Sequence, residues 1–478
     1  GALIPLFATF ASNYALLSIL FAALILALAG AWDDRSDLDY KIKFALQIAA
    51  AGIIIHWGGT EITRLPFFDQ TPLPGWVSKP LTLFVLLAST NAVNLSDGLD
   101  GLAGGMAILA FGVVAILAIE SGQPTELLMA MAVIGGIGGF LRYNNYPAQL
   151  FMGDAGSQFI GLCLGVVVIQ LTFGDATPYC PALALFLLGL PLLDTGQVML
   201  RRISQGRSPF HADRQHLHHR LLDTGLDHYE VVTLMYIGQG VMVFTGFLVR
   251  YQHDLINLLI YTTTGLALIA TVRLPGMVAI RQRLITIKPV ELVRNHSLSG
   301  WIRRVLLLIL GSYFIFIPIF TRDGTVELLA VAIIGLILLL GGCFWTNHDW
   351  IGRLAIYLCG SAVVYLAQNS APPGTLFPAI DSAFYAVVVM LVLAGLRYTR
   401  QKEFELSPFD FLIISCALAV PMIAGPLFGN PKLGQAIANL VVIYYAVEFV
   451  ITSARSKRVL LGWAALSFIA LATQQLAV

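Results

Sequence analysis

Residues 91–105 read NAVNLSDGLDGLAGG, a polar, glycine-rich stretch between two apolar runs at 81–89 and 103–119. Each run, with its flanks, is long enough to cross or nearly cross a bilayer core of about 30 Å. Every third residue from Asn91 to Asp100 is an amide or a carboxylate, and helical backbone would hold neighbours among them near one face. A carboxylate at the bilayer centre costs about 2.5–3.5 kcal/mol. We therefore expect this stretch at a wet membrane boundary beside a cation; an ordinary polar loop is the alternative.

The composition excludes an ordinary soluble protein. The chain has 478 residues, of which 58% are hydrophobic and only 12% are charged, whereas soluble domains carry about 25% charged residues. The apolar runs are continuous and not alternating, which excludes a membrane β-barrel. The pattern predicts an all-α, polytopic integral membrane helical bundle of about 17 spans.

The distribution of basic residues orients this bundle. We expect spans near residues 1–12, 15–31, 43–57, 80–94, 103–119, 127–141, 158–173, 182–200, 231–249, 255–271, 305–320, 328–344, 354–367, 382–396, 411–424, 435–451 and 459–476. With the loops assigned to alternating sides, 23 of the 28 Lys and Arg residues fall on one side and five on the other. The positive-inside rule places the richer side, which carries the polar clusters, in the cytoplasm.

A basic linker divides the chain. We predict a membrane core at 1–272, a cytoplasmic linker at 273–304 and a seven-span extension of unknown role at 305–478. None of the five cysteines forms a Cys-x-x-Cys pair, so we predict neither a zinc site nor a disulfide framework. The first residues, GALIPLF, lack the charged region of a signal peptide, and we interpret them as a chain entered within a span.

Two adjacent carboxylates, Asp33 and Asp34, follow the expected span 15–31. The C-terminal end of a helix is partly negative, so something positive should compensate them. Arg35 and Lys41 could do so, which is the structural interpretation, and a metal ion or a proton in transfer is the functional one. Adjacent carboxylates also raise each other's pKa, which suits a base that works near neutral pH.

A third cluster, FMGDAGS at 151–157, precedes the expected span 158–173. Asp154 or Ser157 could simply cap that helix, but a helix N-terminus flanked by glycines can also bind phosphate. The ring of Phe151 is suited to stacking on a base, or to anchoring the chain at the membrane interface.

The fourth cluster places three histidines in the sequence HLHH at 216–219, with arginines before and after them. A histidine cluster can bind zinc, but no thiolate accompanies this one. With Arg207 and Arg214 nearby, an anion clamp for a diphosphate is the better interpretation. A solvated basic loop is the alternative. Together the clusters offer carboxylates for a metal, donors for phosphates and a ring for a base, as transfer of a phosphoryl-containing group from a nucleotide requires. The membrane suggests a lipid acceptor.

These four clusters resemble the polyprenyl-phosphate N-acetylhexosamine-1-phosphate transferase family over residues 1–235. SPF at 208–210 and DRQHLHH at 213–219 are most similar to bacterial undecaprenyl-phosphate N-acetylglucosamine-1-phosphate transferases, which begin O-antigen, enterobacterial common antigen and teichoic acid lipid intermediates. The resemblance implies an enzyme of the bacterial inner membrane. It would transfer N-acetylglucosamine 1-phosphate, or a related N-acetylhexosamine 1-phosphate, from a UDP-sugar to undecaprenyl phosphate and release UMP.

The resemblance also implies a role for each cluster. Asp154 would be the principal Mg²⁺ ligand, with Mn²⁺ as an alternative ion, and Asn94 or Asp97 would complete the site. Asp33 and Asp34 would place or deprotonate the lipid phosphate, or assist the metal. By the same resemblance, uridine would be contacted by Asp100, Asn144 and Phe151. The diphosphate and sugar would be held by His216, His218, His219, Arg207 and Arg214. A phosphate would be contacted by Lys41.

Two departures from the family stand beside this match. The family has an earlier span and a Pro-Arg-Gly-Gly type of loop, which we expect to be missing here, and the spans after about 304 match nothing in its core. The expected partners are the lipid bilayer and the two substrates, without nucleic acid, and a homodimer is left open. A transporter or lipid-linked sugar flippase is the competing function, because 17 spans are typical of transporters. Transporters, however, bind near the midplane, whereas these clusters lie at one interface.

Overall fold

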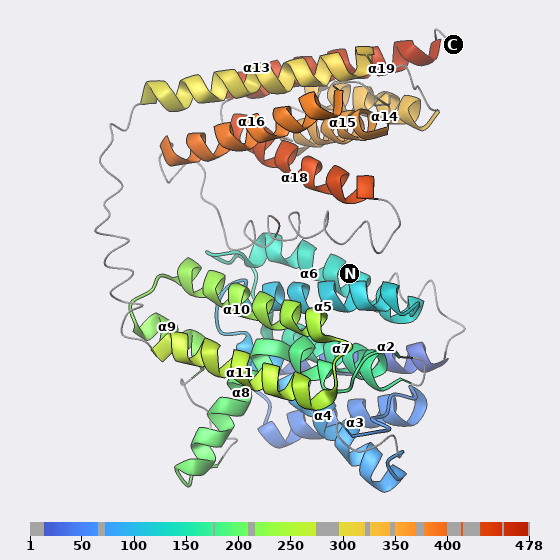
Figure 1. Cartoon of the computed structure of the whole chain (residues 1–478), viewed down its shortest axis with the longest axis vertical. Helices are drawn as coiled ribbons and strands as arrows, with labels where there is room; N and C mark the ends of the chain where they lie inside the picture. The colour runs from blue at the N-terminus through green and yellow to red at the C-terminus, as the bar shows by residue number, and fades with distance from the viewer. Residues whose placement is uncertain are drawn as a thin grey trace. The chain divides into compact units, whose positions relative to one another are not determined.

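A computed structural model describes residues 14–65, 72–174, 177–208, 216–273, 296–320, 326–344, 349–369, 377–398, 413, 431–451 and 454–476. Its contacts divide the chain into two units. The first comprises Gly1–Ile287 and Ser407–Leu412, and the second comprises Lys288–Leu406 and Ile413–Val478. The described residues form helices and no strand (Figure 1). Each unit is considered by itself.

The first unit contains ten labelled helices. They are α2 (Tyr14–Ser36), α3 (Tyr40–Trp57), α4 (Gly75–Ser96), α5 (Leu102–Glu120), α6 (Pro124–Asn144), α7 (Gly153–Phe173), α8 (Leu183–Ser204), α9 (Leu217–Asp223), α10 (His228–Val249) and α11 (Asp254–Arg273). Local sequence explains several boundaries. Pro124 stands in the first turn of α6, where its missing N–H costs nothing. Asp227 and Glu230 form a capping box at the start of α10.

Helix α7 forms the centre of the first unit and packs against α2, α4, α5, α6 and α8. It is buried nearly all round, as its run of apolar residues without a polar face predicts. Ser89 of α4 donates a hydrogen bond to the Gly161 carbonyl of α7 at 2.7 Å. Small residues at such a crossing let two helices approach closely inside a membrane. The middle of α7 is therefore packed closely against α4.

The second unit has its own hydrophobic core, built around Leu306, Phe314, Val363, Phe449 and Phe468. Its helices are α13 (His296–Phe320), α14 (Val326–Phe344), α15 (Asp349–Asn369), α16 (Phe377–Tyr398), α18 (Pro431–Ile451) and α19 (Ala454–Leu476). Helix α13 begins at His296, so residues 296–304 of the expected linker are helical. A helix can continue beyond the bilayer through positively charged residues. The basic residues therefore mark the end of the span and not the end of the helix.

The predicted all-α membrane fold is confirmed. Within the part of the chain that the structure describes, eleven helices are long and apolar enough to cross a membrane, and the chain is a multi-pass membrane protein. Each expected span other than 1–12 and 411–424 coincides with a described helix. Those two lie outside the described residues, apart from Ile413.

Candidate active site

The end of α2 meets the start of α7 at Gly30, where the two backbones almost touch. A Cβ atom at Gly30 would lie 2.3 Å from the backbone nitrogen of Ala155. This approach carries Asp34 to the N-terminus of α7, where its carboxylate accepts hydrogen bonds from the Asp154 N–H at 2.8 Å and the Ala155 N–H at 3.3 Å. The Asp34 carboxylate thus occupies the anion position that the sequence offered to a phosphate.

Three carboxylates gather at this contact, as the sequence predicts from clusters on one membrane face. One oxygen each of Asp33, Asp34 and Asp154 lies within 4.8 Å of the others. Asp33 is buried, whereas Asp34 is exposed and Asp154 is half-buried. Such a group of hard oxygen donors, partly open to solvent, suits a divalent cation such as Mg²⁺.

Lys43 of α3 supplies a positive charge to this cluster. Its Nζ lies 2.5 Å from Asp33 Oδ2 and 3.7 Å from Asp154 Oδ2. The sequence prediction chose Lys41 instead, but Lys41 is exposed and its Nζ lies 5.9 Å from the ring centre of Tyr40. Lys43 and Gln47 are four residues apart in α3, so they share a face. That spacing was the signal for Lys43.

Side-chain amides hold the Asp154 carboxylate in place. Asn94 Nδ2 donates to Asp154 Oδ1 at 3.0 Å and to Ser157 Oγ at 2.9 Å. Gln158 Nε2 donates to Asp154 Oδ2 at 2.9 Å, and Gln47 Nε2 donates to Gln158 Oε1 at 3.0 Å. Asn94 therefore lies beside Asp154, as predicted, with its amide nitrogen facing the carboxylate. Whether Asn94 is a metal ligand stays a prediction.

Asp97 follows α4 and faces the same cluster. Burial, together with the negative charges of Asp154, Asp34 and Asp100, raises the pKa of Asp97 to about 7. A carboxyl group with a pKa near the working pH can both accept and return a proton. The charge of Asp97 therefore responds to positive charge added at the site.

The residues predicted to hold uridine lie at one edge of the site. Asp100 Oδ2 accepts a hydrogen bond from the Ala148 N–H at 3.0 Å. Asn144 is buried; its Oδ1 accepts from the Gly101 N–H at 2.9 Å and its Nδ2 donates to the Leu150 carbonyl at 2.9 Å. These bonds join the 97–101 turn to the loop before α7, so Asp100 and Asn144 shape that loop. Contact with uridine stays a prediction for both.

Phe151 lies at the same edge, because it follows Leu150, whose carbonyl is bonded to Asn144. Phe151 is 74% exposed, which leaves its ring open to stacking. Phe151 and Met152 also line an apolar groove of about 410 Å³ between α6 and α7. Of the two predicted arginines, Arg207 is exposed beyond the end of α8, and Arg214 lies outside the described residues.

The predicted histidines form a row at the start of α9. The rings of His216 and His218 are nearly parallel with centroids 5.9 Å apart, and the centroids of His218 and His219 are 4.2 Å apart. His218 is buried, and within the described residues neither of its ring nitrogens has a hydrogen-bond partner. Burial lowers the pKa of His218 to about 4, and the charges of His219 and His216 contribute. A Cβ at Gly98 would lie 2.3 Å from His218 Nε2, so the row reaches the turn that carries Asp97.

Comparison with known proteins identifies the region that carries most of this site. The sequence model of glycosyl transferase family 4 matches residues 16–172. We refer to residues 16–172, which are similar to that family, as the family 4 region. The family 4 region contains the three clustered aspartates and all the predicted site residues from α2 to α7, and it ends before the histidine row.

Several relatives are similar to this chain over longer stretches than the family 4 region. A "probable undecaprenyl-phosphate N-acetylglucosaminyl 1-phosphate transferase" of Bacillus subtilis (strain 168) is 34% identical over 221 residues, covering 46% of this chain and 62% of that protein. The undecaprenyl-phosphate alpha-N-acetylglucosaminyl 1-phosphate transferases of Escherichia coli O157:H7 and Yersinia pestis are 31% and 34% identical, covering 64% and 62% of their own lengths. The chain thus spans less than two thirds of these relatives.

Proposed function

We propose that this protein transfers N-acetylglucosamine 1-phosphate, or a related N-acetylhexosamine 1-phosphate, from its UDP-sugar to undecaprenyl phosphate and releases UMP. The main observation behind the proposal is that Asp33, Asp34 and Asp154 lie together with Lys43, where the end of α2 meets the start of α7. The names of the relatives supply the acceptor and the sugar phosphate. By the positive-inside rule, we place this site at the cytoplasmic face of a bacterial inner membrane.

The clustered carboxylates fit a magnesium ion. Three carboxylates against one lysine leave excess negative charge, which a divalent cation offsets. Asp154, with Asp33 or Asp34, would hold the ion, and the amides around Asp154 fix the direction of its oxygens. When bound, Mg²⁺ supplies neutralisation of charge on the transferred phosphoryl group.

The chain's own residues then place the two substrates for direct attack. The lipid phosphate has a second pKa of about 6, as for other phosphate monoesters, so it is largely ionised at neutral pH. One of its oxygens forms the new bond to the β-phosphorus of the donor, and the bond from that phosphorus to the bridging oxygen breaks, so UMP leaves. Lys43 orients a phosphate oxygen, and the histidine row holds the diphosphate. No covalent aspartyl intermediate is required.

We also propose that the transfer reaction belongs to residues 1–272. All the described site side chains lie on α2 to α9 and their loops, and the first unit has a core separate from that of the second. In the second unit, Tyr313, Asp381 and Tyr385 form a buried hydrogen-bonded group, and Arg353 pairs with Glu448. These contacts join neighbouring helices of the second unit. We assign them no part in the reaction.

The test is UMP release by the purified protein in detergent with undecaprenyl phosphate, Mg²⁺ and a series of UDP-sugars. We expect UMP release only when lipid is present, with UDP-N-acetylglucosamine or UDP-N-acetylgalactosamine preferred. A stoichiometric burst of UMP without lipid would replace direct attack by a covalent intermediate. Preference for UDP-N-acetylmuramoyl-pentapeptide would move the protein to another branch of the family. A transporter would release no UMP with any donor.

The pKa of Asp97 predicts a link between pH and magnesium. Below pH 7 the metal-free site holds a proton on Asp97, and Mg²⁺ must expel that proton. The Mg²⁺ concentration for half-maximal UMP release should therefore fall about tenfold from pH 6 to pH 8, with little change above pH 8. Asp97→Asn should flatten this dependence, whereas the same change at the exposed Asp223 should not. An equally steep dependence in Asp97→Asn would assign the proton to another group, such as the lipid phosphate.

A further inference from the structure

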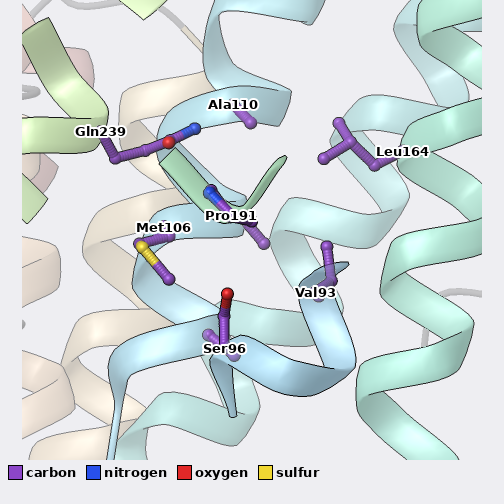
Figure 2. A pocket seen from close by; sticks show the side chains of 9 residues that line it. Val93, Ser96, Met106, Ala110, Leu164, Pro191 and Gln239 are labelled. Carbon is purple, nitrogen blue, oxygen red and sulfur yellow. The ribbon is translucent and has the colours of Figure 1, made fainter. Parts of the chain in front are cut away.

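Helix α8 is broken at Gly189, and a side chain from α10 repairs the break. Gly189 has φ +52° and ψ −132°, a conformation that L-residues with a side chain rarely adopt. The Leu190 N–H, freed from the helix ladder, donates to Gln239 Oε1 at 2.8 Å. Gln239 is buried, and Figure 2 shows its side chain beside Pro191, across a small pocket that Ser96 of α4 also lines. The break therefore sets the direction of the second half of α8 against the end of α4.

The second half of α8 carries Asp194, a buried carboxylate that makes two hydrogen bonds. Its Oδ2 lies 2.9 Å from His216 Nδ1, and its Oδ1 accepts from the Leu217 N–H at 2.9 Å. Asp194 is only 4% exposed and His216 5%. An ionised carboxylate can only accept, so Nδ1 of His216 carries the proton and the orientation of the ring is fixed. Nε2 of His216 then points away from α8.

His216, whose ring Asp194 orients, belongs to the histidine row that reaches the turn carrying Asp97. His216 and His218 lie parallel, and His218 packs against Gly98, next to Asp97. The main chain of α9 also depends on Asp194, because its Leu217 N–H bond lies in the first turn. One carboxylate therefore controls both the backbone and the ring at the start of the row.

We propose that Asp194 is a positioning residue for the transfer reaction, acting through His216. This inference rests on the proposed function, in which the histidine row holds the donor diphosphate. Asp194 keeps Nδ1–H of His216 occupied and so presents Nε2 to the phosphate groups, as the acid behind a metal-bound histidine orients its ring. Gln239 acts one step further back, since it holds the helix segment from which Asp194 projects.

A double-mutant cycle separates this role from simple support of α9. In Asp194→Asn, the amide oxygen can still accept from the Leu217 N–H, but the amide nitrogen faces His216 Nδ1 and favours the other ring tautomer. We expect a folded protein whose kcat/KM for the UDP-sugar is about 10- to 100-fold lower. In a His216→Ala background the same change should cost less than about twofold, because the group through which Asp194 acts is gone.

Three comparisons make the outcome decisive. Asp223→Asn, the same exchange at the exposed end of α9, should stay within about twofold of the wild type. If Asp194→Asn does not fold in detergent, Asp194→Glu replaces it in the cycle, because it keeps both acceptors but moves them by one methylene. Equal losses with and without His216, or an unaffected Asp194 variant, would overturn the inference. Absence of UMP release by the wild type would instead overturn the proposed function.

Discussion

Asp154→Asn is expected to lower UMP release by about 10³-fold or more while the protein stays folded. The Asp154 carboxylate faces Asp33, Asp34 and Lys43 and accepts hydrogen bonds from Asn94 and Gln158. The substitution keeps the shape and the bond from Asn94 but removes the charge. A hard cation then loses its central ligand, and several kcal/mol of charge stabilisation in the transition state corresponds to a loss of this size.

The control is again Asp223→Asn, the same chemical change at an exposed position outside the site. Both variants are measured at several Mg²⁺ concentrations, with thermal unfolding in the same detergent to show equal folding. Raising Mg²⁺ should restore little of the lost rate. A near-normal rate for Asp154→Asn at low Mg²⁺ would show that the central ligand is a different carboxylate.

The fold could be predicted well because its signal is local. Each apolar run is continuous and bounded by polar residues, so most helix ends lie within a few residues of the expected ones. The meeting of Asp33 and Asp34 with Asp154 was predictable too. Helices that cross a membrane alternate in direction, so the end of α2 and the start of α7 must share one face.

The pairing of particular side chains could not be predicted, because it depends on helix rotation and tertiary contact. The sequence contains both Lys41 and Lys43, and only the packing of α3 brings Lys43 to Asp33. The Asp194–His216 pair joins the second half of α8 to the start of α9, 22 positions apart, and the sequence offers a lone aspartate in an apolar run. For Asn144 contact with uridine stays a prediction, and the sequence did not reveal that both ends of its amide bond to the backbone.

The second large effect is expected at Gly30, which lies outside the chemistry but sets its spacing. A Cβ at this position would lie 2.3 Å from Ala155 N and 2.5 Å from the Asp154 carbonyl carbon. Both atoms are backbone and cannot rotate away, so Gly30→Ala must separate α2 from α7 by roughly 1 Å to reach ordinary contact. The bonds from the start of α7 to Asp34 would then stretch or break.

We expect Gly30→Ala to lower UMP release by about 10²-fold, because a misplacement of that size at reacting groups has such a cost. Overpacking should also lower the free energy of unfolding by about 1–3 kcal/mol. The matched control is Gly52→Ala in α3, where no atom lies within 4 Å of the added Cβ. It should leave activity unchanged and stabilise the helix by up to about 1 kcal/mol. Full activity in Gly30→Ala would mean that α2 and α7 can separate without moving the carboxylates, and that their spacing is set elsewhere.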